Sequence, residues 1–269
     1  MGRLSLSRAW EETAAILVRE GGLLSAVALA LIVLPQVFLA VVGLPIGAQA
    51  TLPAQLIYIA SVLLSFVAQI AINRLAIGPS VTVREAIAQG FMRVVSVFAV
   101  LIVLALMLAV VAIILAMVLS ALGIMILPGA GKPPTPSFVA LLIILMGLFF
   151  AIFQLSFPIA AVETGNPIRM ISRSWQLARH HYLRLLAFVV TVFIGLGLVV
   201  IATQFGLGSV IVLFLGKPEP GSLSALVLGL IAGVVQAAFT VVTAAMLARI
   251  YVQLAGRGDA QPSVPSSGI

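Results

Sequence analysis

The sequence predicts an all-α polytopic membrane protein, and three observations support this fold class. The chain of 269 residues is 63% hydrophobic and only 8% charged, whereas a soluble domain carries about 25% charged residues. Its mean hydropathy is +1.31. Six apolar stretches are long enough to cross a bilayer as helices, which takes roughly 20 residues each. We therefore expect lipid to surround most of the protein, because so few charges could not keep its surface in water.

The six expected spans form three hairpins. Turn-forming sequences separate the members of each pair, GLPIGAQATLP after the first span, PGAGKPPTP after the third and GKPEPGS after the fifth. About 20 polar and amphipathic residues precede the first span, so a cleavable signal peptide is not expected. The expected spans cover about 22–45, 53–73, 94–127, 137–162, 184–215 and 221–250.

Basic residues fall almost entirely on one side of these spans. Twelve arginines lie on that side, against Lys132 and Lys217 on the other. The positive-inside rule then predicts that both termini of this multi-pass membrane protein lie in the cytoplasm. The arginines are Arg3, Arg8, Arg19, Arg74, Arg84, Arg93, Arg169, Arg173, Arg179, Arg184, Arg249 and Arg257.

The segment NPIRMISRSWQLARHHYLRL (166–185) concentrates cations between two spans. As one helix it is apolar and aromatic on one side and basic on the other, which is typical of a helix lying at the membrane interface. The cations Arg169, Arg173, Arg179, His180 and Arg184 are expected to contact anionic lipid headgroups, at about 1 kcal/mol each. The apolar stripe is Ile171, Trp175, Ala178 and Tyr182, and the opposite side carries Arg169, Arg173, Gln176, His180 and Arg184.

Two further segments show the same +4, +3, +4 spacing of apolar residues before the other hairpins. The chain therefore divides into three units at about 6–73, 80–162 and 168–250, each a cytoplasmic amphipathic helix followed by a hairpin. All three belong to a single membrane domain, 1–256, and the polar tail 257–269 is expected to be disordered. Trp10, Trp175 and Tyr182 are the expected interfacial anchors. The stripes are Leu6, Trp10, Thr13 and Leu17, and Val83, Ile87, Gly90 and Val94.

The stretch ETGNPIRMISRSWQLARHHYLRLLAF and the later LARIYVQL resemble a known family. They are similar to the membrane domain of glycerophosphoryl diester phosphodiesterases and to the related bacterial YciC-like inner-membrane proteins. The resemblance implies a six-span inner-membrane protein. It implies no phosphodiesterase activity, because that activity belongs to a separate soluble barrel. The residues that carry the resemblance are Glu163, Arg173, Ser174, Trp175, Leu177, Tyr182 and Arg184.

The polar residues near the basic segment are expected to have structural roles rather than catalytic or metal-binding ones. Glu163 is expected to pair with an arginine of the following helix, or with Arg74 or Arg93. His180 and His181 diverge by about 100° on a helix and have no acidic neighbours, so no metal site is expected. The chain has no cysteine, which excludes thiolate ligands, and no cofactor is expected. We find no catalytic constellation and expect no enzyme.

Inside the spans the polar residues are amides and hydroxyls. Pro35 and Pro158 are expected to kink the first and fourth spans. The favoured role of the amides and hydroxyls is hydrogen bonding between helices, for Gln69, Asn73, Thr240 and Thr243 as for the others. The alternative is a polar path beside Gln36, Gln154, Gln204 and Gln236. Small residues suited to close helix packing are Gly195, Gly197, Gly229 and Gly233.

Three functions remain open at this point. The leading hypothesis is a non-catalytic, envelope- or lipid-associated membrane protein that engages anionic lipids or a membrane-protein partner through its cytoplasmic arginines. The second is a small-solute transporter or channel. The third is a lipid-headgroup enzyme using Glu163, His180 and nearby arginines. Nucleic acid is not an expected partner, because the basic residues are confined to short segments between spans.

Overall fold

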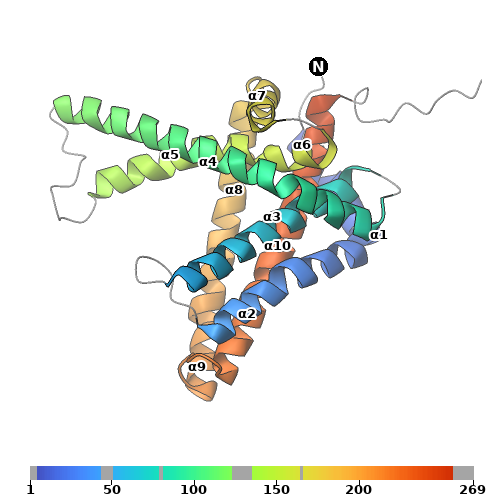
Figure 1. Cartoon of the computed structure of the whole chain (residues 1–269), viewed down its shortest axis with the longest axis vertical. Helices are drawn as coiled ribbons and strands as arrows, with labels where there is room; N and C mark the ends of the chain where they lie inside the picture. Colours follow the sequence, from blue (N-terminus) through green and yellow to red (C-terminus); the bar gives the residue numbers. More distant parts are fainter. Residues whose placement is uncertain (1–4, 44–50, 79–80, 123–134, 164–165, 257–269) are drawn as a thin grey trace, which may run out of the picture.

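The structure, a computed structural model, describes residues 5–43, 51–78, 81–122, 135–163 and 166–256 (Figure 1). Six of its helices are long and apolar enough to cross a membrane, and no strand occurs in the described ranges, so the all-α polytopic fold is confirmed. Arg3, Lys132, Arg257 and the tail 257–269 lie outside them. The elements are α1 (Leu6–Ala28), η1 (Leu29–Val33), α2 (Leu34–Val42), α3 (Leu52–Ile77), α4 (Val83–Ala121), α5 (Pro136–Gln154), α6 (Ser156–Val162), α7 (Pro167–Ala178), α8 (Tyr182–Ile201), η2 (Ala202–Leu207), α9 (Gly208–Leu215) and α10 (Leu223–Ala255).

Both predicted kinks coincide with interruptions in the helices. A proline has no N–H to donate, so the chain must adjust in the turn that precedes it. Before Pro35 it forms the π-helical turn η1, in which the Leu34 N–H donates to the Leu29 carbonyl five residues earlier. Before Pro158 the chain changes from α5 to α6 at Leu155. The six spans are therefore α1–α2, α3, α4, α5–α6, α8–α9 and α10.

The three expected hairpins are present, and they diverge from a common end. In Figure 1 the tips of α2/α3, α4/α5 and α9/α10 point in different directions, while the other ends meet near α7 and the start of α1. Helix α10 is central to the packing, because it contacts α1, α2 and α3 along much of its length. Helix α3 in turn packs against α4.

Two glycines allow α10 to approach the first span closely. A Cβ atom on Gly229 would lie 2.5 Å from the Cβ of Ala40, and one on Gly233 would lie 3.2 Å from the Cα of Val33. The expected small-xxx-small contact is therefore confirmed at these positions. It is wrong for Gly195 and Gly197, where an added Cβ would meet nothing within 4 Å.

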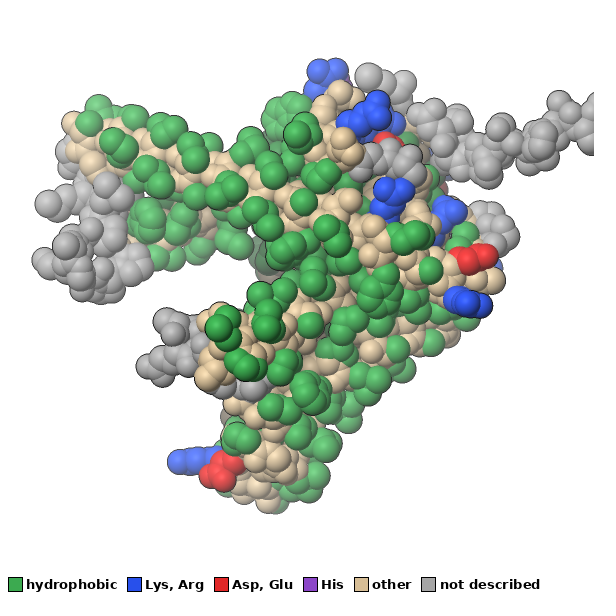
Figure 2. Space-filling model, in the orientation of Figure 1, with side chains coloured by type: hydrophobic (Ala, Val, Ile, Leu, Met, Phe, Trp, Pro, Cys, Tyr) green, Lys and Arg blue, Asp and Glu red, His purple; other side chains and the backbone are tan. Residues whose placement is uncertain are grey.

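Hydrogen bonds between distant segments hold the common end together. The Ser5 N–H donates to Gln253 Oε1 at 3.1 Å, and Arg249 Nη2 donates to the Ala76 carbonyl at 2.6 Å. We call this region the basic end, because the charged side chains visible in Figure 2 gather over it, apart from those at the tip beyond α9. The described arginines on these segments are Arg8, Arg19, Arg74, Arg84, Arg93, Arg169, Arg173, Arg179, Arg184 and Arg249, whereas Lys217 follows α9.

The amphipathic segments differ from prediction in two ways. The first two are continuous with their spans in α1 and α4, and only the third forms a helix of its own. The expected stripes are buried or partly buried against the protein, except at Trp10 and Trp175, which stay outside and are each 52% exposed. The buried residues are Ala9, Thr13 and Ile16 in α1, Ala86, Gly90 and Val94 in α4, and Met170, Ser174 and Ala178 in α7.

Candidate functional site

Helix α7 is shorter than the sequence predicts. It begins at Pro167, whose fixed φ suits the first turn. Asn166 occupies the N-cap position, although its side chain makes no capping hydrogen bond. The helix ends at Ala178, and α8 begins at Tyr182 after a short turn. The single helix expected over 166–185 is therefore wrong, and Arg184 belongs to α8.

The side chains of α7 form three faces. At about 100° per residue, the buried residues form one face against the protein. A second face is polar and carries two arginines. A third is apolar and exposed, with Ile168 at 77% and Trp175 at 52%. The polar face is made by Arg169, Ser172, Arg173 and Gln176.

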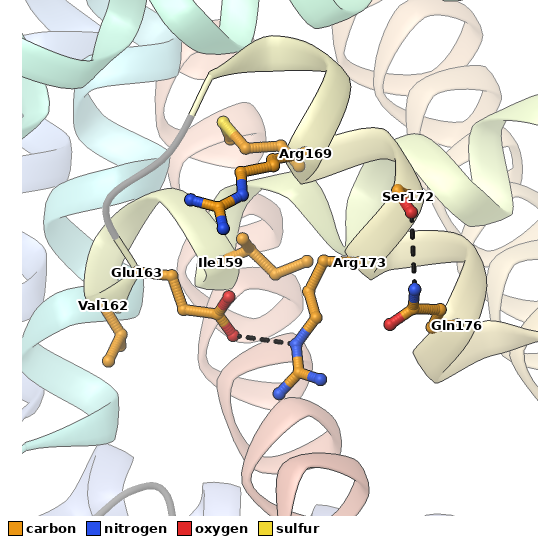
Figure 3. Close-up of a pocket in the computed structure, with 8 residues that line it drawn as sticks. Ile159, Val162, Glu163, Arg169, Ser172, Arg173 and Gln176 are labelled. Carbon is orange, nitrogen blue, oxygen red and sulfur yellow. Dashed lines mark hydrogen bonds and ion pairs between the residues drawn. The ribbon is translucent and has the colours of Figure 1, made fainter.

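A cavity of about 600 Å³ lies between the polar face of α7 and the end of α6. In Figure 3 the guanidinium groups of Arg169 and Arg173 lie on either side of the Glu163 carboxylate. The cavity therefore brings both arginines and the acid to one place. Its lining residues are Ile159, Val162, Glu163, Arg169, Met170, Ser172, Arg173 and Gln176.

Glu163 is the structural centre of this site. Its Oε1 accepts a hydrogen bond from Arg173 Nε at 3.2 Å and another from the Tyr251 hydroxyl at 2.8 Å. The carboxylate thus joins the end of α6 to α7 and α10. Of the pairings expected for Glu163, the structure places it with an arginine of the following helix.

The arrangement is suited to binding an anion. Two guanidinium groups and one carboxylate give the cavity a net positive charge. Arg169 is exposed, and its guanidinium group makes no hydrogen bond or ion pair with any residue in the described part of the chain. A guanidinium can bind phosphate or carboxylate oxygens in a bidentate manner. The Ser172 hydroxyl accepts from Gln176 Nε2 at 3.4 Å at the same face.

The structure separates the other predicted cations from this cavity. Arg179 and His180 lie in the turn after α7, Arg184 lies on α8, and none of the three lines the cavity. The enzyme hypothesis required His180 beside Glu163 and two arginines, and the cavity contains only the acid and the arginines. Among the described residues, no three His, Asp or Glu side chains group as metal ligands.

The three predicted aromatic anchors have different surroundings. Trp10 and Trp175 are exposed on α1 and α7. Tyr182 instead donates its hydroxyl hydrogen to the Leu148 carbonyl at 2.7 Å, and its ring lies 6.4 Å from that of Trp175. Because the chain turns before α8, Tyr182 links α8 to α5 rather than extending the exposed face of α7.

A second cavity, of about 140 Å³, lies among the spans. It brings together two of the four predicted glutamines, Gln154 of α5 and Gln236 of α10, with Gln69 of α3. Gln36, on α2, does not line it, and the side chain of Gln204 lies outside the described part of the structure. The lining residues are Gln69, Phe150, Gln154, Val192, Phe193, Leu196, Gln236, Phe239, Thr240 and Thr243.

Comparison with known families assigns the chain to a family by its sequence. Residues 4–254 match the model of a family described as a domain of unknown function, DUF7847. The chain belongs to this family. No curated protein and no solved structure matches it. The DUF7847 match extends across all six spans and both cavities, so the two sites lie within the part of the chain that defines the family.

Two features of this DUF7847 chain were not singled out by the sequence patterns. Tyr251 stands in LARIYVQL, and its pairing with Glu163 joins residues that are 88 positions apart. Gln69 was predicted only to hydrogen-bond between helices, yet it lines the second cavity. A weak signal existed for Gln69, because Asn73 follows at i+4 and gives α3 a polar strip in an apolar span.

Proposed function

We propose that the protein is a non-catalytic, lipid-associated inner-membrane protein that binds anionic phospholipid headgroups at α7. The headgroup phosphate would lie in the cavity of Arg169 and Arg173. The observation that carries the proposal is the position of this positive cavity beside the exposed apolar face of the same helix. A headgroup and an interfacial side chain can then be accommodated by adjacent faces of α7.

Helix α7 presents both the apolar side chains and the charged donors that contact with an anionic lipid requires. Ile168 and Trp175 present an apolar side chain and an amphipathic ring, which suit the boundary between headgroups and acyl chains. Arg169 and Arg173 supply charge-assisted donors for a phosphate, whereas Glu163 offsets one of the two positive charges. The site therefore favours lipids with a net negative charge over zwitterionic ones.

The distribution of basic residues supports an orientation with the basic end in the cytoplasm. Ten of the twelve arginines are in the described ranges, on the segments that form that end, while Lys217 lies at the opposite tip. Cytoplasmic arginines hinder translocation of the loops that carry them. In a bacterial plasma membrane, α7 would then meet the anionic inner leaflet.

The experiment uses tryptophan quenching by brominated lipid in proteoliposomes. The chain has two tryptophans, so Trp10→Phe leaves Trp175 as the single reporter. We expect brominated phosphatidylglycerol to quench Trp175 more strongly than brominated phosphatidylcholine at equal mole fraction. Arg169→Gln should lower this preference about fivefold, because it removes a direct charge-assisted hydrogen bond to the phosphate, worth about 1 kcal/mol.

Arg84→Gln is the matched control. It removes the same charge from an exposed position of the basic end, but Arg84 does not line the cavity. Its lipid preference should remain within about twofold of the unmutated protein, since surface charge outside the site is screened by salt. Equal quenching by both lipids in the unmutated protein, or equal losses in both variants, would contradict the proposed site.

A further inference from the structure

The second cavity lies at a depth where amides are uncommon in a membrane protein. On α10, Gln236 is thirteen residues before Arg249, which is about 20 Å along the helix at 1.5 Å per residue. Thr243 is six residues before Arg249, or about 9 Å. The cavity therefore lies among the spans, about 9–20 Å along α10 from Arg249, at a level where hydrocarbon would surround the helices.

Its polar groups point to a ligand rather than to helix packing. Gln154 is only 9% exposed, and its Oε1 has no hydrogen-bond partner among the described residues. Gln236 is exposed on the central part of α10, where contact with hydrocarbon would leave its amide unsatisfied. An amide in a membrane span normally bonds to a neighbouring helix. Both of these glutamines line the cavity instead.

The Thr240 hydroxyl adds an acceptor to the same wall. It donates its hydrogen to the Gln236 carbonyl at 2.8 Å, and its oxygen keeps lone pairs that can accept a hydrogen bond. The side-chain amides of Gln69, Gln154 and Gln236 add further acceptor oxygens, and they can also donate. A ligand with O–H or N–H groups would satisfy them.

The rest of the lining limits the charge and size of that ligand. None of the described residues that line the cavity is ionisable, and a bound ion at this depth needs a counter-charge or many ligands. The rings of Phe150 and Phe193, with centroids 5.0 Å apart, give one wall an apolar surface for C–H groups. The volume of about 140 Å³ is room for about five water molecules at about 30 Å³ each, which suits a small solute.

We infer that this cavity is a binding site for a small uncharged solute that carries hydroxyl or amide groups, of the polyol or carboxamide class. Gln154, Gln236 and Thr240 would hold its polar groups, and the phenylalanines would contact its carbon atoms. The site is separate from the cavity at α7 and does not depend on the lipid function proposed for that cavity.

Cysteine accessibility in proteoliposomes tests this inference, because the chain contains no cysteine of its own. Thr243→Cys places a thiol in the cavity, and its reaction with N-ethylmaleimide reports hydration, since the reacting thiolate forms only where water can reach it. Val234→Cys, on the same helix but not in the lining, is the lipid-facing control. We expect Thr243→Cys to react at least tenfold faster, and glycerol to slow its reaction severalfold.

Three controls make the outcome decisive. Ser7→Cys, exposed on α1, measures any direct effect of glycerol on the reagent and should not be protected. In the Thr243→Cys background, Gln154→Leu should abolish protection by glycerol, whereas Gln36→Leu, which removes the same amide outside the cavity, should preserve it. Size-exclusion elution confirms that each variant is folded before labelling.

Each contrary result overturns a defined part of the inference. Equal rates at positions 243 and 234 would mean that the cavity is dry and binds no polar solute. Rapid labelling without protection by glycerol or urea would mean a water-filled cavity without a solute site. Protection by potassium or ammonium chloride, and not by the uncharged probes, would mean that the ligand is a cation.

Discussion

Glu163 has two opposing effects at the level of single residues. Its carboxylate holds Arg173 and Tyr251 together, and it also reduces the positive charge of the α7 cavity. Glu163 thus stabilises the fold, but its negative charge weakens the attraction of the α7 cavity for anions. Substitution should therefore change stability and lipid preference in opposite directions.

We predict that Glu163→Gln strengthens the anionic-lipid preference of Trp175 quenching about fivefold, because it removes about 1 kcal/mol of opposing charge. The same change should lower the midpoint of thermal unfolding in detergent by about 2–4 °C, the effect of losing up to about 1 kcal/mol from a partly exposed ion pair.

Glu12→Gln is the control for this prediction. Glu12 pairs with Arg8 at 2.9 Å on α1. The substitution therefore also removes one carboxylate from the basic end, but at a position away from the cavity. It should leave the lipid preference unchanged. A similar gain in both variants would show that general surface charge, rather than the α7 cavity, determines the preference.

At the level of helices, close packing depends on which face a small residue occupies. Gly229 and Gly233 lie against the first span, whereas Gly195 and Gly197 of α8 meet nothing within 4 Å. The sequence alone presents all four as equivalent small residues in apolar helices. Their different roles follow from tertiary contacts between spans that are far apart in the chain.

We predict that Gly229→Ala destabilises the protein by about 1–3 kcal/mol, because the new Cβ overpacks the contact with Ala40. Gly197→Ala should have no such cost, and it should raise helix propensity by up to about 1 kcal/mol. The fraction of protein that remains monodisperse after heating in detergent measures both. Equal losses in the two variants would contradict the packing of α10 against α2.

The same distinction explains how far sequence patterns could predict the elements. Apolar runs of sufficient length predicted all six spans, because the bilayer sets the length of a helix. Within the amphipathic stripes, Trp10 and Trp175 stay exposed, because hydrophobicity does not separate a face that meets lipid from one that meets protein. The end of α7 was also not predictable, since Arg179, His180 and His181 include no proline or glycine to mark a turn.

At the level of the whole molecule, the three hairpins share one end and separate toward their tips (Figure 1). Contacts at the basic end join α1 to α10, α3 to α10 and α6 to α10. The sequence predicted this common side from its arginines. It could not predict that α10 would be central, because the hydrophobic pattern of a span does not specify its neighbours.

We predict that the basic end and the α9/α10 tip label from opposite faces of the membrane. Lys217→Cys should react with an impermeant maleimide in right-side-out vesicles, because few cations prevent translocation of that tip. Ser7→Cys and Arg179→Cys should react only after permeabilisation. Labelling of positions 7 and 217 from the same face would contradict the topology.

The hydrogen bond between Ser5 and Gln253 has a consequence for engineering the chain. Because these two segments already meet, a short linker could join them in a circular permutant whose new ends open between α9 and α10. Every helix would keep its neighbours, yet both ends would now face the compartment that the original ends avoid. Such a rearranged gene would display fused tags or reporter domains on the opposite side of the membrane while leaving the bundle unaltered.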